Sequence, residues 1–409
     1  IQESEKYYID KINIFGNNVT AENVIRNQFE VDEGDPFNEI LENKSINNLK
    51  SLGFFKTVDK EIVDVANSNT KIINLNVIEK PTGEISAQAG VGTDGSSVGF
   101  GVKENNYLGK GISLDTNFSF SVDSFKGKFS ITDPNYKNSD KSLYANIEAT
   151  ETDRLSAFGY KTNKTGISLG TEFEYYDDFD IGLGVNSYYE KIQTDSTAST
   201  RQQKLKGNYF DNHLALSFDY DKRNQKFQTT NGFRSYYSLD LPVISETNTL
   251  MNTFITTKYF EYLNNNVLKS SLYLKNSSSI SGDNVKLSER LYLPSNRLRG
   301  FEQGKIGPKD GNDFIGGNYV ASLNISSTVP KFFENSQSTD FKIFLDIANV
   351  WGVDYDSNLD SSQDIRSAIG LGLDWFSPIG PMNFSLTEVI SQNSTDITET
   401  FRFNLGTTF

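Results

Sequence analysis

The sequence predicts a mainly β protein, in which a 16-stranded antiparallel transmembrane β-barrel follows one small α/β domain. The chain is polar on average, with a mean hydropathy of -0.48, yet 13% of its residues are aromatic. That mixture is expected where half of each strand faces lipid and half faces water. From Glu84 onward, apolar residues recur with a period of two over about 320 residues. A soluble all-β protein can share these features, but repetition this long without a helical segment favours the barrel.

Composition excludes several classes of protein. A net charge of -14 argues against a nucleic-acid partner, which would require a basic face. There is no cysteine and His213 is the only histidine, so we expect no metal site, no cofactor and no catalytic triad. No run of about 18 apolar residues exists, which excludes a transmembrane helix. The chain begins at Ile1 without a signal-peptide pattern, so we expect a processed chain or part of a longer one.

Residues 1–81 predict a separate domain with the order β-α-α-β-β. A short strand over residues 9–15 ends at Gly16, and Thr20 is the predicted cap of a first helix. A second helix follows Asp35-Pro36 and ends at Gly53. Two further strands lie near residues 58–63 and 72–78. The resulting three-stranded sheet leaves an edge that can pair with an extended peptide or, alternatively, serves only to support the barrel.

Residues 82–409 predict the barrel. Residues 112–122 are the clearest strand, with large apolar side chains on one face and Ser, Asp and Asn on the other. The sixteen predicted strands lie near residues 84–93, 97–104, 112–121, 124–131, 142–151, 164–175, 179–191, 210–221, 232–241, 251–263, 266–276, 316–327, 339–349, 366–376, 381–391 and 400–408. Turn signals between them include Thr93-Asp94-Gly95, Asn231-Gly232, Asn264-Asn265 and Pro378-Ile379-Gly380.

A long connection at residues 281–315 separates two of these strands. It contains the run Arg297-Leu298-Arg299-Gly300-Phe301, followed by further glycines and Pro308. Long connections in compact proteins are usually functional or disordered. We expect this one to fold back into the lumen and dock Arg299; a solvated surface loop is the alternative.

Several motifs resemble the Omp85 superfamily. Leu298-Arg299-Gly300-Phe301 with Ile306-Gly307-Pro308 is similar to its signature loop. The order of the N-terminal elements, with Gly16-Asn17 and Leu52-Gly53-Phe54-Phe55, resembles a POTRA domain. Further stretches are similar to the branch of this superfamily that assembles β-barrels: Asn106-Tyr107-Leu108-Gly109-Lys110-Gly111, Phe227-Gln228-Thr229-Thr230-Asn231-Gly232, Phe344-Leu345-Asp346 with Val350-Trp351, Trp375-Phe376-Ser377-Pro378-Ile379-Gly380-Pro381 and the terminal run Phe401 to Phe409.

The resemblance implies a bacterial outer-membrane barrel with its N-terminal domain in the periplasm. It implies a non-enzymatic assembly factor that folds and inserts other β-barrels. The implied partners are unfolded outer-membrane β-barrel proteins, accessory lipoproteins and outer-membrane lipid. It also implies that Arg299 pairs with an acidic residue on the inner wall. Alternation along the strands turns Asp346 and Asp374 inward, and Asp346 is the first choice.

The first and last strands predict a second site, a lateral seam. The first strand carries small outward residues, Ala87 and Ala89, and inward glycines, Gly90 and Gly92. A weak, short pairing would let the barrel open sideways and accept a client strand. Alternatively, these small residues only permit close backbone approach. The last strand alternates cleanly: Phe401, Phe403, Leu405 and Phe409 point outward, and Arg402, Asn404 and Gly406 inward.

Other functions fit less well. A polypeptide translocation or secretion pore of the same superfamily is the main alternative. A passive porin would leave the N-terminal domain and the long loop unexplained. A hydrolase is disfavoured because His213 offers no clear base and nucleophile pair.

Overall fold

The computed structural model describes residues 6–226, 228–263, 266–329, 339–359, 363–377 and 380–406. The chain divides into two compact units. One unit contains Ile1–Ser86, Gly101–Thr116 and Phe129–Ala145, and the other contains Ala87–Phe100, Asn117–Lys128 and Asn146–Phe409. The boundary between residues 81 and 82 therefore stays a prediction. The described helices include none that is long and apolar enough to cross a membrane.

The N-terminal domain has the predicted β-α-α-β-β order. Its sheet has the order β1-β3-β2, in which β1 runs parallel and β2 antiparallel to β3. Ile25, Leu49 and Leu75 are fully buried where the helices cover this sheet. The elements are β1 (Tyr8–Phe15), α1 (Glu22–Arg26), α2 (Glu39–Ser51), β2 (Phe55–Asp64) and β3 (Thr70–Glu79).

The predicted cap of the first helix was wrong. Helix α1 begins after Ala21, and no side chain caps it. Thr20 is buried and has other partners: its N–H donates to Glu79 (2.6 Å), and its hydroxyl accepts from Asn106 (2.9 Å). The Asn106 side chain also accepts from the Gly111 N–H at 2.7 Å, which closes the turn after β5. Long-range partners therefore displaced the local capping bond.

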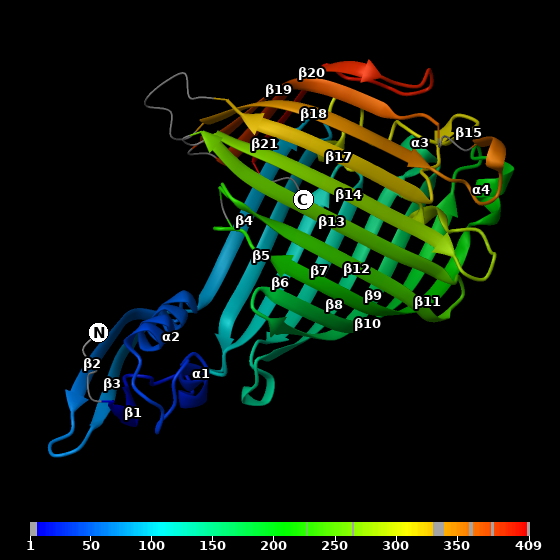
Figure 1. Ribbon diagram of the computed structural model, residues 1–409. Helices are drawn as coiled ribbons and strands as arrows, with labels where there is room; N and C mark the ends of the chain where they lie inside the picture. Colours follow the sequence, from blue (N-terminus) through cyan, green and yellow to red (C-terminus); the bar gives the residue numbers. More distant parts are fainter. Residues whose placement is uncertain are drawn as a thin grey trace. The chain divides into compact units, whose positions relative to one another are not determined.

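The barrel is closed and contains the sixteen predicted strands (Figure 1). Consecutive strands are neighbours around the wall, and the last strand, β21, meets the first, β4. The strands are β4 (Gly83–Gly92), β5 (Gly95–Tyr107), β6 (Ile112–Ser121), β7 (Ser124–Asp133), β8 (Lys141–Arg154), β9 (Tyr160–Tyr176), β10 (Phe179–Thr194), β11 (Gly207–Asp221), β12 (Gly232–Ser245), β13 (Thr249–Leu263), β14 (Asn266–Ser279), β17 (Tyr319–Thr328), β18 (Thr339–Trp351), β19 (Arg366–Ser377), β20 (Gly380–Ser391) and β21 (Phe401–Gly406).

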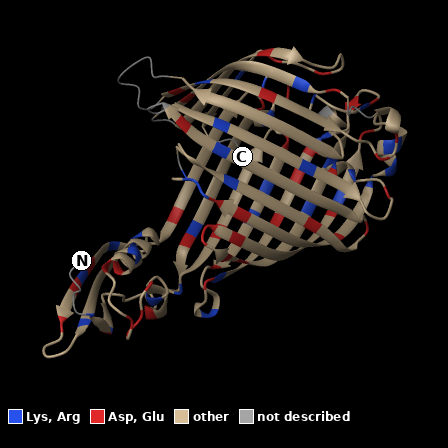
Figure 2. Cartoon of the chain, viewed as in Figure 1, with Lys and Arg blue, Asp and Glu red and all other residues tan. Residues whose placement is uncertain are grey.

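The two faces of the wall differ as the alternation predicts. On β18, Phe341 and Ile343 are exposed outward, whereas Phe344 and Asp346 are buried. Charged residues lie on strands as well as in connections (Figure 2). Several charged side chains on the strands are buried and therefore face the interior. They include Glu190, Asp211, Asp346, Arg366 and Arg402. An apolar outer face and a polar inner face suit lipid outside and water inside.

Short elements lie in the connections between strands. They are the helices α3 (Leu155–Phe158), α4 (Thr200–Lys204), η1 (Tyr136–Asn138), η2 (Leu287–Glu289), η3 (Ser295–Arg297) and η4 (Ser357–Leu359), and the strands β15 (Lys309–Asp310) and β16 (Asp313–Phe314). Phe227 of the predicted turn motif, the turns at Asn264-Asn265 and Pro378-Ile379, and the terminal Phe409 lie outside the described residues.

We predict that deleting residues 1–80 leaves a folded barrel, because the closed strand order involves only β4 to β21. Like the intact protein, the deletion protein should migrate faster on a gel before heating than after. A protein that never gives the compact, heat-sensitive band would contradict this prediction.

Candidate functional site

The long connection between β14 and β17 is packed against the barrel's inner wall. Leu298, Phe301 and Ile306 are buried in one cluster with residues of β14, β17, β18 and β19. Near the start of the connection, Val285 and Leu287 are buried, and near its end so are Phe314 and Ile315. A solvated surface loop would leave such side chains exposed. We call residues 281–315 the lumenal loop.

Arg299 and Asp346 form a bidentate ion pair at the centre of this loop. Arg299 Nε lies 2.7 Å from Asp346 Oδ2, and Nη2 lies 2.8 Å from Oδ1. The Arg299 backbone N–H also donates to Oδ2, at 3.1 Å. Asn324 on β17 donates to Oδ1 at 2.8 Å and to the Arg297 carbonyl at 2.7 Å. The carboxylate is fully buried, and the guanidinium covers the Phe344 ring.

Gly300 and Phe301 complete the docked turn. Gly300 has φ +89°, and a Cβ there would lie 2.7 Å from Thr387 Cγ2 on β20. Both facts require glycine. On either side of the Arg-Gly pair, the Leu298 and Phe301 side chains are each 2% exposed. The motif thus buries two apolar side chains and brings the arginine backbone against the inner wall.

Asp374, the second candidate partner of Arg299, lies elsewhere. It pairs with Lys342 and accepts from Asn383 at 2.9 Å. The reason is register: Ala368, not Asp374, lies opposite Asp346 on β19. Six residues along a strand correspond to about 20 Å. Alternation gave the correct face for Asp374 but not its height in the barrel.

Sequence reasoning missed three further basic anchors of the lumenal loop. Lys286 is 3% exposed and contacts Glu190 of β10, Asp211 of β11 and Glu289. Burial lowers the pKa of Lys286, but the three carboxylates outweigh burial and hold that pKa above its usual value. Arg290 pairs with Asp354, and Arg297 donates to Ser271 at 2.8 Å. The sequence signal that could have identified these anchors is the cluster of basic residues at Lys286, Arg290 and Arg297 in a chain of net charge -14.

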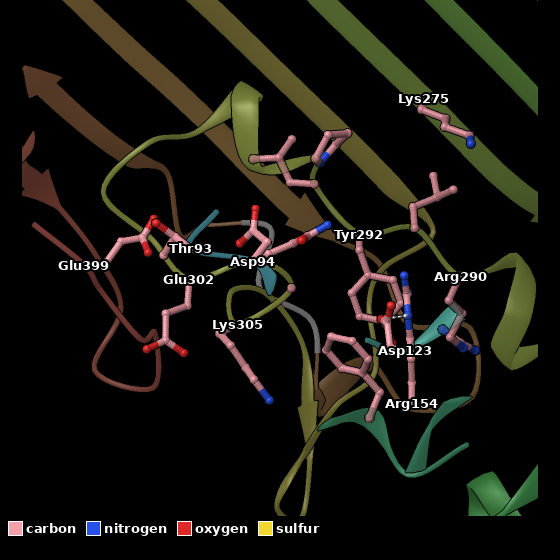
Figure 3. Close-up of a pocket in the computed structure, with 16 residues that line it drawn as sticks. Thr93, Asp94, Asp123, Arg154, Lys275, Arg290, Tyr292, Glu302, Lys305 and Glu399 are labelled. Atoms are coloured by element: carbon pink, nitrogen blue, oxygen red, sulfur yellow. Dashed lines mark ion pairs between the residues drawn. The ribbon is translucent and has the colours of Figure 1, made fainter. Parts of the chain in front are cut away.

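A cavity of about 640 Å³ lies beside the lumenal loop. Figure 3 shows charges of both signs around it, including Asp94 and Glu399 near the seam, Glu302 and Lys305 on the loop, and the ion pair between Arg154 and Asp123. Apolar residues of the loop, such as Leu291 and Leu293, form part of the same wall. A space this polar suits water or a hydrated polypeptide segment.

The part of the seam between β4 and β21 that the structure describes is short. Within the described residues, the register pairs are Asn404 with Gly92, Leu405 with Val91 and Gly406 with Gly90. The ladder between β20 and β21 has five pairs, and that between β12 and β13 has nine. At one end of the seam, the Thr93 N–H donates to the Phe403 carbonyl, and the Phe403 N–H donates to the Thr93 hydroxyl, both at 3.0 Å.

Two seam glycines are required by close backbone approach. A Cβ at Gly92 would lie 2.8 Å from the Phe403 carbonyl oxygen. Gly406 has φ +78°, and its Cβ would lie 2.2 Å from the Ala89 carbonyl oxygen. This geometry supports the alternative interpretation of these two positions, in which small residues permit contact.

The other predicted seam residues are placed as follows. Ala87 and Ala89 are exposed and have no partner in the described part of the β4–β21 ladder. Phe401 pairs with Leu386 and Phe403 with Phe384, both on β20. Phe409 lies outside the described residues. His213 is buried on β11, and its Nε2 has no hydrogen-bond partner in the described part of the chain.

Comparisons with known proteins match most of the chain. The family model of the Omp85 superfamily domain matches residues 106–409, and a POTRA model, described as a surface antigen variable number repeat, matches residues 7–80. "Outer membrane protein assembly factor BamA" of Neisseria meningitidis serogroup B is 24% identical over 460 residues. That alignment covers 100% of this chain and 57% of the relative, so the chain spans little more than half the length of that relative.

Solved structures agree in fold. BamA from Haemophilus ducreyi lacking POTRA domains 1–3 has a TM-score of 0.87 and 25% identity, covering 99% of this chain and 85% of that one. CdiB from Acinetobacter baumannii has a TM-score of 0.60 and 13% identity, covering 98% and 74%, and this likeness concerns the fold alone.

We predict that Arg299→Ala and Asp346→Ala each lower the stability of the barrel. Breaking a buried ion pair costs roughly 3–5 kcal/mol, and less in a wet lumen. Because each change removes the same contact, the double variant should lose less stability than the sum of the two single variants. Heat-modifiability on gels, scored against temperature, measures this.

Asp374→Ala is the matched control. Its carboxylate pairs with Lys342, so its effect should add to that of Arg299→Ala. Additive effects for Arg299 and Asp346, or single variants as stable as the parent, would contradict the pairing.

Proposed function

The chain belongs to the Omp85 superfamily, and we propose that it is an assembly factor that folds β-barrel proteins and inserts them into the outer membrane. The barrel lies in the outer membrane, and the POTRA domain lies in the periplasm. The proposed activity needs no covalent step, and its free energy would come from the folding of the client. The partners that we propose are unfolded outer-membrane β-barrel proteins, accessory lipoproteins and outer-membrane lipid.

The short seam is the observation that carries this proposal. Each interstrand hydrogen bond is worth roughly 0.5–1.5 kcal/mol net in water, and more in lipid, where water cannot replace it. Opening the three register pairs that the described residues form across the seam therefore costs far less than opening a ladder of nine. The freed edge of β4 would then pair with a client strand by β-augmentation.

Two further features support the proposed partners. The POTRA sheet has β2 at an edge, where an extended segment of a client or accessory protein can add. On the barrel wall, exposed apolar residues such as Phe120, Ile343 and Leu371 provide the surface for lipid. The lumenal loop is docked on the inner wall through the ion pair of Arg299 with Asp346, which favours insertion at the wall over passage through the lumen.

A polypeptide translocation pore is the second candidate. The cavity of about 640 Å³ beside the lumenal loop is the observation that favours it. In that case the loop would have to leave its site on Asp346 to admit a chain. The two candidates differ in whether the seam or the lumen must open.

We predict that locking the seam abolishes client insertion. Val91 and Leu405 form a register pair, so Val91→Cys with Leu405→Cys should give a disulfide in this cysteine-free chain. A cysteine pair at Ala89 and Asn404 would not face each other across the seam, because Asn404 lies opposite Gly92. Folding of an added barrel protein in liposomes should stop on oxidation and return on reduction.

The control is a lock placed within the wall. Leu323→Cys with Ile347→Cys joins β17 to β18, which the proposal leaves paired throughout. This variant should insert clients in both redox states. Full activity with the seam oxidised would contradict lateral opening and favour the translocation pore.

A further inference from the structure

The lumenal loop is hydrogen-bonded through its backbone to the segment that leads into the last strand. The Glu399 N–H donates to the Gly300 carbonyl at 3.0 Å, and the Glu302 N–H donates to the Ile397 carbonyl at 3.0 Å. The Ile397 N–H donates in turn to the Lys305 carbonyl at 3.1 Å. An isolated bridge between Phe301 and Thr398 lies between these bonds. The docked motif therefore holds residues 397–399 directly, two residues before β21 begins.

Arg402 extends this contact to the first strand. Its side chain is 6% exposed, and its Nη2 donates to the Phe301 carbonyl at 3.2 Å. The same guanidinium pairs with Glu399 and with Asp94, which lies in the turn after β4. One side chain thus joins the lumenal loop, the last strand and the first hairpin. Arg402 lies beside Phe403, whose backbone bonds Thr93 at the end of the seam.

The charges around Arg402 explain why an arginine is needed. Asp94 and Glu399 converge on it, and Glu302 lines the same cavity as both. Without the guanidinium, carboxylates from the turn after β4, from the segment before β21 and from the loop would repel one another at the seam. Arg402 supplies donors to all three elements at once, which a single Lys ammonium with its point geometry does less well.

We propose that Arg402 is a positioning residue that holds the seam closed while the lumenal loop is docked. Displacement of Arg299 from Asp346 would shift the Gly300 and Phe301 carbonyls, which are the acceptors for Glu399 and Arg402. The seam would then lose the contacts made by Arg402 at the same time as it loses those of the loop. This inference deepens the proposed assembly function, but its test measures opening of the seam and not client insertion.

Hydrogen–deuterium exchange of the purified full chain in lipid nanodiscs tests the proposal. In Arg402→Gln, amides of residues 90–93 and 401–406 should exchange about tenfold faster, the change expected from loss of one charge-assisted hydrogen bond. Amides of β17 and β18 should be unchanged. Asp94→Asn removes the partner in the exposed turn and should act in the same direction, even if Arg402→Gln folds poorly. Arg402→Lys keeps the charge and should restore part of the protection.

Arg234→Gln is a control for loss of an arginine charge away from the seam, because Arg234 forms a more exposed ion pair with Asp219 in the wall, on strands β12 and β11. It should leave exchange at the seam unchanged. Arg299→Ala should open the seam, and combining it with Arg402→Gln should add little, since both act through the same contact. Seam exchange that stays within about twofold of the parent in Arg402→Gln and Asp94→Asn, or that rises equally in Arg234→Gln, would overturn the proposal.

The outcomes also separate this proposal from the proposed function. Faster seam exchange in a protein that inserts no client would retain the role of Arg402 and reject the assembly function. Client insertion that depends on an unlocked seam, with seam exchange unaffected by Arg402→Gln, would retain the assembly function and reject the role of Arg402.

Discussion

The buried carboxylate of Asp346 is the constraint on which the interior of the barrel depends. A charge removed from water is costly unless donors surround it. Arg299 supplies three donors and Asn324 a fourth. Meeting that requirement fixes the backbone of the lumenal loop, and it brings Gly300 so close to Thr387 that no other residue fits. The geometry of one ion pair thus determines where the Gly300 and Phe301 carbonyls lie.

Those carbonyls link the interior to the wall. A β-barrel normally holds its strands by ladder bonds alone, but within the described residues the last strand has five register pairs on one side and three on the other. The contacts of residues 397–402 with the lumenal loop add to these few pairs. A strand held partly by side chains and a loop can be released by a local change, whereas a strand held by a full ladder requires many bonds to break together.

The sequence predicted the strands well because a strand with lipid on one side and water on the other must alternate. The same alternation identified both Asp346 and Asp374 as inward carboxylates, with Asp346 the first choice, but it did not give their heights in the barrel. Height in a barrel is set by register between neighbours, which the turns decide and which alternation does not encode. Thr20 failed as a cap for a related reason, since its partners Glu79 and Asn106 are distant in sequence.

The anchors of the lumenal loop have a mechanical consequence. Lys286 binds β10 and β11, whereas Gly300 touches β20, and β10 and β20 are eight places apart in the order of sixteen strands. The loop therefore crosses the lumen along a diameter and connects opposite sides of the wall. This connection resists flattening of the barrel's cross-section. The seam lies next to the strand at one end of this connection, so β4 and β21 can separate without stretching the loop. The barrel wall can thus part at one line while its cross-section keeps its form.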